Sequence, residues 1–192
     1  MVSLFLHGEI GSDRWKNQIL EIIEKHNFNK KIVLSPNLLD ENENRQRKRI
    51  LKIFRGYDDS EIFENFPKKI DWKLAVLNQD DLLKVKYIEY DYWAELSGGT
   101  RFAKDSVSTI KNGTEIFGVK NDNFIRLAEH IKSGNSLEPL IIIASNTDSN
   151  KMIVLEGHAR LTAIHLAIEH VSEIKALIGF TGEEDLNRWN RY

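Results

Sequence analysis

Two short apolar segments separated by a polar turn most constrain what this chain can fold into. The first, "EPLIIIA" at 138–144, contains a continuous apolar run, and the second, "KMIVLE" at 151–156, is nearly as apolar. Runs of this length are typical of strands that are buried on both faces of a sheet. The polar residues "SNTDSN" at 145–150 join them, so we predict a β-hairpin inside the protein.

Helices are predicted on both sides of this hairpin. In "NDNFIRLAEHIKSG", the apolar residues Phe124, Leu127, Ala128 and Ile131 follow the i, i+3, i+4, i+7 spacing of an amphipathic helix, and Gly134 ends it. The fold class is therefore α+β (mixed α/β). Further predicted elements are a strand at 70–77, a helix at 79–88 capped by Asn78, short helices at 103–113 and 181–192, a helix at 157–170, and a strand at 173–180.

The N-terminal residues predict a small β-α-β unit. "VSLFL" at 2–6 and "KKIVLSP" at 30–36 are expected to be strands, and "SDRWKNQILEIIEKH" at 12–26 a helix between them. We expect residues 1–66 to form this extension and to pack on a main domain of residues 67–192.

A basic segment follows, "RQRKRILKIFR" at 45–55, in a predicted helix that ends at Gly56. It has no acidic residue and could contact a polyanion. The alternative is a solvated helix face opposite Ile50, Ile53 and Phe54. The net charge of -2 excludes a protein whose whole surface binds nucleic acid. The candidate DNA contacts are Arg45, Arg47, Lys48 and Arg49.

The turn after the hairpin has the features of an anion site. A strand that ends at Glu156 and a helix that begins near His158 place several unpaired backbone amides at one point, with the positive end of the helix dipole. Gly157 allows close approach of a ligand, and Arg160 can grip phosphate oxygens with two N–H groups. The alternative is an ordinary turn with a surface arginine.

The order of these elements resembles the ParB/sulfiredoxin superfamily, in which a Pro-bearing strand, a hairpin strand and a Gly-x-x-Arg helix start follow one another. The resemblance covers roughly residues 70–180 and is strongest over 121–180. It implies a ParB/sulfiredoxin-like fold whose helix start binds nucleotide phosphates, as in members that process ATP or ADP. The matching residues are Glu138, Pro139, Gly157, His158, Ala159 and Arg160.

The chain also departs from that family. Sulfiredoxins need a cysteine in the turn, whereas this chain has Ala159 there and no cysteine anywhere. About twelve residues follow the last predicted strand, without the further domains of partition proteins. We therefore expect a stand-alone member, a group that includes ATPase and DNase proteins and free-serine kinases.

A second candidate region is "YWAELSGGTR" at 92–101. Its glycine-rich loop can offer amides, and Thr100 and Arg101 can assist in holding phosphates. Tyr92 and Trp93 could stack on a base, or they belong to the core.

Phosphoryl transfer also needs a base and a metal to spread charge. Glu95 and Glu156 are the candidates to activate a nucleophile or to bind Mg²⁺. His158 is the third candidate catalytic residue and could contact phosphate. His158 and His165 are two helical turns apart, about 10 Å along the axis, so they cannot share an ion.

These residues predict an enzyme that binds ATP or another nucleotide with Mg²⁺ and hydrolyses or transfers its phosphate, with an associated DNase activity. The alternatives are a nucleotide-gated regulator without turnover and a small-molecule kinase. No apolar run approaches the ~20 residues of a membrane span, and the N-terminus does not read as a signal peptide. We expect a cytoplasmic protein, a nucleotide and DNA as partners, and no membrane contact.

Overall fold

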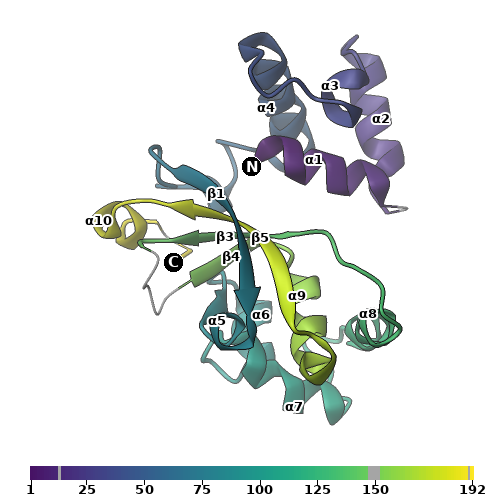
Figure 1. Ribbon diagram of the computed structural model, residues 1–192, viewed down its shortest axis with the longest axis vertical. Helices are drawn as coiled ribbons and strands as arrows, with labels where there is room; N and C mark the ends of the chain where they lie inside the picture. Colours follow the sequence, from purple (N-terminus) through teal and green to yellow (C-terminus); the bar gives the residue numbers. More distant parts are fainter. Residues whose placement is uncertain (13, 147–151, 190) are drawn as a thin grey trace. The chain divides into compact units, whose positions relative to one another are not determined.

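The computed structural model describes residues 1–192 except 13, 147–151 and 190. The chain divides into two compact units, unit 1 (Met1–Asn65) and unit 2 (Phe66–Tyr192). Helices and a mixed β-sheet occur together, so the predicted α+β class is confirmed (Figure 1).

The regular elements of unit 1 are all helical in its described residues, and the predicted β-α-β extension is wrong. "VSLFL" lies in helix α1 (Val2–Gly11), and "KIVL" forms the short helix α3 (Lys31–Leu34). A short apolar run fits a buried helix as well as a strand, so periodicity alone cannot distinguish them. The predicted helix after residue 12 is confirmed as α2 (Lys16–Lys25).

The longest helix of unit 1 is α4 (Glu41–Arg55), and it ends at Gly56 as predicted. The side chain of Asp40 accepts hydrogen bonds from the amides of Asn42 and Glu43, which caps its N-terminus. A 3₁₀ turn, η1 (Glu61–Phe63), follows. The four helices share one core, formed by Leu6, Ile10, Ile19, Ile22, Ile23, Ile32, Val33, Ile50, Leu51 and Phe54.

Unit 2 is built on a sheet of five strands in the order β1-β5-β3-β4-β2, counted over its described residues. The strands β3 and β4 are antiparallel neighbours, which confirms the predicted hairpin; its turn at 147–150 lies outside the described residues. β1 pairs with β5 antiparallel, whereas β3 with β5 and β2 with β4 are parallel. The bounds are β1 Asp71–Asn78, β2 Val85–Tyr87, β3 Leu140–Ala144, β4 Met152–Glu156 and β5 Glu173–Phe180.

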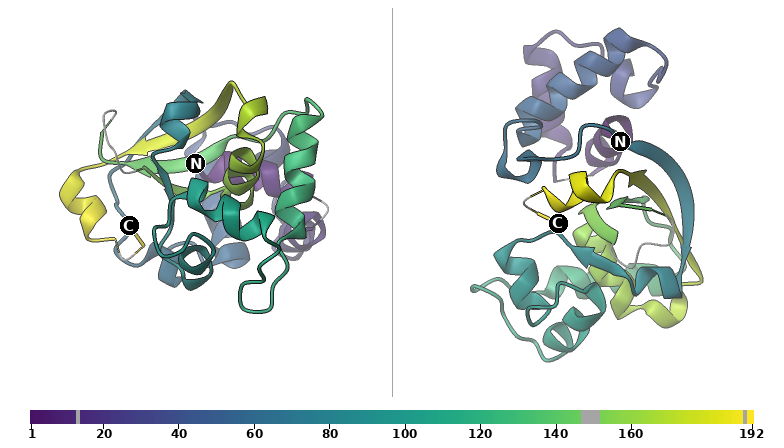
Figure 2. Two further views of the ribbon diagram at one scale, coloured as in Figure 1. Left: turned by 90° about the horizontal axis from the view of Figure 1, so that it is seen from below. Right: turned by 90° about the vertical axis from the view of Figure 1, so that its left-hand side faces the viewer.

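Helices α5 to α9 lie on one side of this sheet (Figures 1 and 2). Leu140, Ile142 and Val154 point toward them and share a core with Leu161 and Ile164 of α9. The helices of unit 2 are α5 (Gln79–Leu82), α6 (Asp91–Leu96), α7 (Ser106–Lys111), α8 (Asp122–Lys132), α9 (His158–Leu166) and α10 (Glu183–Asn187), with 3₁₀ turns η2 (Ala103–Asp105) and η3 (Ile168–His170).

The helix predicted at 79–88 is much shorter than expected. Its cap is correct, because the Asn78 side chain accepts from the Asp81 amide and the Asp81 carboxylate accepts from the Asn78 amide. The helix α5 nevertheless ends at Leu82, and the next residues form β2. Val85 and Tyr87 are fully buried beside β4, and this packing outweighs local helix propensity.

Candidate phosphate-binding site

Gly157 forms the turn between β4 and α9, and the position requires glycine. Its φ is 100°, in the region that side chains rarely adopt. A Cβ added there would lie 2.7 Å from Cδ2 of Leu140 and 3.0 Å from Nη2 of Arg160. The missing side chain therefore leaves room for the arginine to lie against the turn.

The N-terminus of α9 is open to an acceptor. No side chain caps it, and the first intrahelical bond of this turn runs from the Leu161 amide to the Gly157 carbonyl at 2.8 Å. The amides of His158, Ala159 and Arg160 precede that bond, at the end of the helix with partial positive charge. Ala159 is exposed, so its small side chain does not cover them.

Arg160 folds back over this turn. Its Nη2 lies 3.2 Å from Oε1 of Glu156 and 3.4 Å from the Pro139 carbonyl oxygen, and its Nε is buried with no hydrogen-bond partner. The side chain is 22% exposed, so solvent and ligands can reach part of the guanidinium. The structure thus brings together four of the predicted residues, namely Pro139, Glu156, Gly157 and Arg160.

His158 stands at the same helix start but carries no charge at neutral pH. Burial, and then the positive charge of Arg160, lower the pKa of its imidazole to about 3. Although the residue is half-buried, its Nε2 is shielded from solvent and has no partner. Its ring stacks on Trp93, with centroids 5.0 Å apart. Any contact of His158 with a phosphate would therefore involve a neutral imidazole, not a cation.

Sequence reasoning missed a buried polar network that fixes the first turn of α9. The Tyr87 hydroxyl lies 2.6 Å from Oγ1 of Thr162 and 3.2 Å from Oγ of Ser106. Thr162 in turn donates to the His158 carbonyl at 2.8 Å. Burial raises the pKa of Tyr87 to about 12, so its hydroxyl stays protonated. Thr162 follows His158 by four residues, one helical turn, and this spacing was the only sign of it in the sequence.

Thr100 and Arg101 are engaged elsewhere in unit 2. The Thr100 hydroxyl donates to Oδ2 of Asp105 at 2.5 Å. Arg101 donates to the Tyr192 carbonyl at 3.1 Å, and its Nη1 lies 3.6 Å from a carboxylate oxygen of Glu89. Neither side chain is bonded to a residue of the Gly157 turn, so the structure does not join them to the other predicted residues.

The two aromatic residues of the second region have partners inside unit 2. The Trp93 ring lies near the rings of Tyr87 and Phe124 as well as that of His158. The Tyr92 ring meets Trp93 edge to face, and its hydroxyl donates to Asn121 at 2.8 Å. This is the core packing that the sequence left open as the alternative to base stacking.

The remaining predicted carboxylates are exposed. Glu95 lies on α6 two residues beyond Trp93, and Glu138 lies just before β3. Glu138 and Pro139 belong to the lining of a hollow of about 540 Å³ between the residues that follow α8 and the start of β5. The Pro139 carbonyl also accepts a hydrogen bond from Arg160, so Pro139 connects this hollow to the arginine.

The prediction that Arg47 contacts DNA is wrong. Arg47 is 1% exposed, and its two terminal nitrogens already make four hydrogen bonds inside unit 1. A phosphate therefore finds both terminal nitrogens already engaged. Its acceptors are the carbonyls of Ile32 and Asn37, the Glu43 carboxylate and the Asn44 side chain. Arg45, Lys48 and Arg49 are exposed on the same helix.

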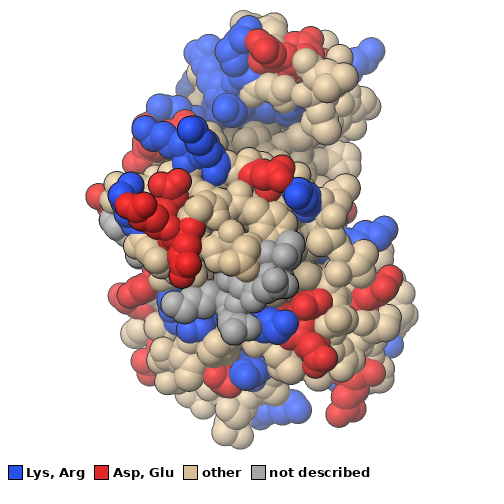
Figure 3. All heavy atoms as spheres, turned by 60° about the vertical axis from the view of Figure 1, so that its left-hand side comes forward, with Lys and Arg blue, Asp and Glu red and all other residues tan. Residues whose placement is uncertain are grey.

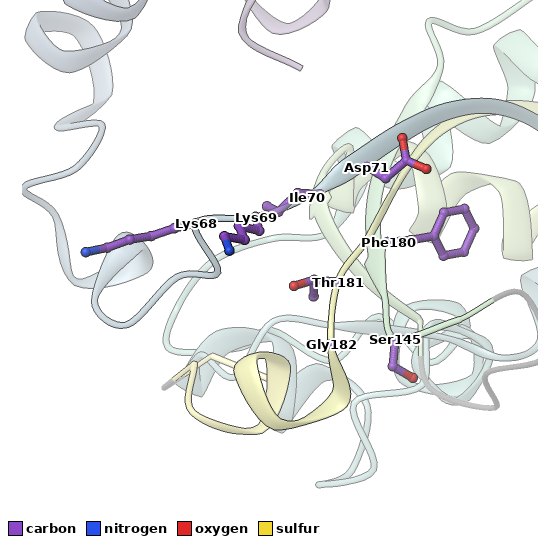
Figure 4. A pocket seen from close by; sticks show the side chains of 8 residues that line it. All are labelled: Lys68, Lys69, Ile70, Asp71, Ser145, Phe180, Thr181 and Gly182. Atoms are coloured by element: carbon purple, nitrogen blue, oxygen red, sulfur yellow. The ribbon is translucent and has the colours of Figure 1, made fainter.

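A second hollow, of about 730 Å³, lies at the ends of β1 and β5 (Figure 4). The Thr181 hydroxyl is buried without a hydrogen-bond partner, and Figure 4 shows it on the same side as the Lys69 ammonium group. Gly182, which lines this hollow, directly precedes helix α10, whose first turn carries three acidic residues. None of the predicted site residues lines it; the lining is Lys68, Lys69, Ile70, Asp71, Ser145, Phe180, Thr181 and Gly182.

The described residues contain no group of three or more His, Asp or Glu side chains arranged to hold a metal ion. Within the same residues, no helix has the length and apolar character needed to cross a membrane. No family model matches the chain, and neither a curated protein nor a solved structure matches it with significance.

The two buried histidines of α9 predict a loss of stability in mild acid. Burial also lowers the pKa of His165, to about 4, against an unfolded value of about 6.5. Between these pKa values and about pH 6.5 the unfolded chain binds protons that the folded chain does not. The free energy of unfolding should therefore fall as pH drops through 6, by up to about 1.4 kcal/mol per pH unit for each imidazole.

Urea unfolding between about pH 5 and 7 measures this slope, in a range where most carboxylates stay ionised. His165→Gln removes one of the two imidazoles and should make the slope shallower. A free energy of unfolding that stays constant over this range would contradict the prediction.

Proposed function

We propose that unit 2 binds a nucleotide, ATP or a related triphosphate, through its phosphates at the N-terminus of α9. One observation carries this proposal: the uncapped helix start at Gly157, with the guanidinium of Arg160 lying against it. Backbone amides and the helix dipole favour a phosphate at such a point. The ParB/sulfiredoxin-like element order supports a nucleotide rather than another anion.

Phosphate would compete with Glu156 for Arg160. The carboxylate of Glu156 holds the guanidinium, with Nη2 and Oε1 3.2 Å apart. This pair is partly exposed, and such ion pairs contribute only about 0–1 kcal/mol. A doubly charged phosphate that also accepts from the helix amides can therefore displace it.

Mg²⁺ would enter this site with the nucleotide. Its role would be to spread the charge that develops on the phosphates, and the phosphate oxygens would supply ligands to it. Among the predicted carboxylates, Glu156 stands closest to the turn in sequence and is freed when phosphate takes Arg160. We propose it as the residue that activates the attacking nucleophile, with the exposed Glu95 as the alternative.

Binding without turnover is the second candidate function. The observation in its favour is that His158 is neutral with a buried Nε2, and so cannot exchange protons readily near pH 7. A nucleotide-gated regulator needs phosphate binding alone. Cleavage of DNA, or transfer of a phosphoryl group to a small-molecule hydroxyl, would instead use the same phosphate-binding turn with a different acceptor.

Thermal unfolding of the full chain with ATP, ADP, CTP and GTP, with and without Mg²⁺, tests nucleotide binding. A ligand that binds the folded state alone raises its stability by about 2.7 kcal/mol at a hundredfold excess over Kd. We expect at least one nucleotide to raise the unfolding midpoint. No shift with any of the four would contradict the proposal.

Turnover is then measured as phosphate release and as cleavage of plasmid DNA. Glu156→Gln and Glu95→Gln separate the two base candidates, because each removes a carboxylate at nearly constant volume. Loss of phosphate release with retained nucleotide binding identifies the base. Nucleotide binding without any product in the wild type identifies the regulator.

A further inference from the structure

Helix α4 carries a face of exposed cations that the packing of unit 1 does not use. Arg45, Lys48, Arg49 and Lys52 follow the i, i+3, i+4, i+7 spacing, so they lie on one side of the helix. Its other side packs in the core through the apolar residues Ile50, Leu51 and Phe54. The sequence alone left this segment as either a polyanion site or a solvated face.

A second segment carries further exposed cations. The Arg49 guanidinium lies 5.7 Å from the centroid of the Phe28 ring, and the short helix α3, which begins at Lys31, is in contact with α4. Lys30 and Lys31 lie at the start of α3 and are both exposed. Figure 3 shows Lys and Arg side chains gathered on one side of unit 1, at the top of the view.

Few acidic groups neutralise these cations. Lys30, Lys31 and Lys48 have no ion pair among the described residues. Arg45 lies 3.7 Å from the Glu41 carboxylate and Lys52 2.9 Å from that of Asp59, and both pairs are exposed. Exposed pairs contribute about 0–1 kcal/mol, so a phosphate can replace either carboxylate.

We propose that this face, formed by Lys30, Lys31, Arg45, Lys48, Arg49 and Lys52, binds the sugar–phosphate backbone of a nucleic acid. From residue 45 to residue 52 the helix rises about 10 Å. A DNA duplex presents one charge per about 1.7 Å of its axis, so several phosphates lie within reach of this row. Contacts of this kind hold the backbone without reading the base sequence.

This binding involves unit 1 alone and does not depend on the nucleotide site of unit 2. The buried Arg47 does not take part: it holds α4 to the residues before the helix, while its exposed neighbours face outward. The structure thereby divides the basic segment into one structural arginine and the cations available to a ligand.

Fluorescence anisotropy of the full chain with a labelled 20-base-pair DNA duplex tests the proposal, with single-stranded DNA and duplex RNA as parallel arms. With four to five phosphate contacts, the logarithm of the binding constant should fall against log salt with a slope of about -4. The affinity should drop by about 250-fold from 50 to 200 mM salt. The arm with the tightest binding identifies the nucleic acid.

The variant Lys48→Glu/Arg49→Glu should bind at least tenfold more weakly and flatten that slope by about two. The control Lys111→Glu/Lys120→Glu makes the same charge change at exposed residues of unit 2 and should bind within about threefold of the wild type. Lys48→Gln/Arg49→Gln gives a second, milder variant, and circular dichroism verifies that each is folded.

Three outcomes would overturn the proposal. One is the absence of binding to all three nucleic acids at 50 mM salt. Another is equal weakening in the unit 1 variant and in the control, which would show an effect of total charge alone. The third is salt-sensitive binding to phosphatidylserine vesicles that the unit 1 variant loses while nucleic-acid binding persists unchanged.

Discussion

Replacing Arg160 with alanine will weaken nucleotide binding by roughly 10- to 100-fold and leave unit 2 folded. The arginine would give the phosphates charge-assisted hydrogen bonds, and bonds of that kind contribute about 1.5–3 kcal/mol. At a nucleotide concentration a hundred times the wild-type Kd, the stabilisation of about 2.7 kcal/mol would shrink to about 0.4 kcal/mol after a hundredfold loss of affinity. Thermal unfolding of both proteins measures the difference.

Two further variants make this result specific. Arg160→Lys retains the charge but loses the planar, two-point grip, so its response should fall between those of the wild type and Arg160→Ala. Arg126→Ala removes an exposed arginine of α8 and should respond like the wild type. If Arg160→Ala kept the full nucleotide response, the Gly157 turn would not be the phosphate site.

Replacing Arg47 with methionine will unfold unit 1 or bring it close to unfolding. The substitution keeps an unbranched, largely apolar side chain but leaves the carbonyls of Ile32 and Asn37 and the Glu43 carboxylate without their donor. Breaking a buried ion pair by removing one partner costs about 3–5 kcal/mol. A unit of this size has little stability in reserve.

Urea unfolding followed by far-ultraviolet circular dichroism measures this effect as a loss of helix at low urea. The matched control is Lys48→Met, one residue along the same helix, where the side chain is exposed and the change should stay within about 0.5 kcal/mol. Equal stability of Arg47→Met and Lys48→Met would show that the buried hydrogen bonds of Arg47 are dispensable.

The parts of the fold that the sequence predicts are those set by contiguous residues. The hairpin is recognised from two continuous apolar runs joined by a polar turn, and α8 from apolar residues that recur with the helical period. The strands expected at 2–6 and 30–36 failed because a short apolar run also fits a helix. Leu6 and Val33 are buried against residues of the other helices of unit 1, and this packing between segments distant in sequence selects helix over strand.

The same distinction applies to the site. Glu156, Gly157 and Arg160 are neighbours in sequence, so their meeting at one turn follows from the local pattern. The bond between Tyr87 and Thr162 joins residues 75 positions apart, and the bond of Arg101 to Tyr192 spans 91 positions. No pattern in the sequence foretells either. These two distant bonds engage Arg101 outside the turn and give α9 its buried support.

The sheet order has a consequence for how the protein is made. β5 lies between β1 and β3, so β1 has no neighbour in the described sheet until the ribosome has passed residue 180. The helices of unit 1 pack through contacts between residues near in sequence, so this unit can fold early. Pairing of β1 with β5 instead joins segments about a hundred residues apart. A nascent chain will thus carry a folded helical segment ahead of an unpaired strand. Until then, the unpaired backbone groups of that strand lie beside Leu74 and Val76, which stay exposed even in the folded sheet.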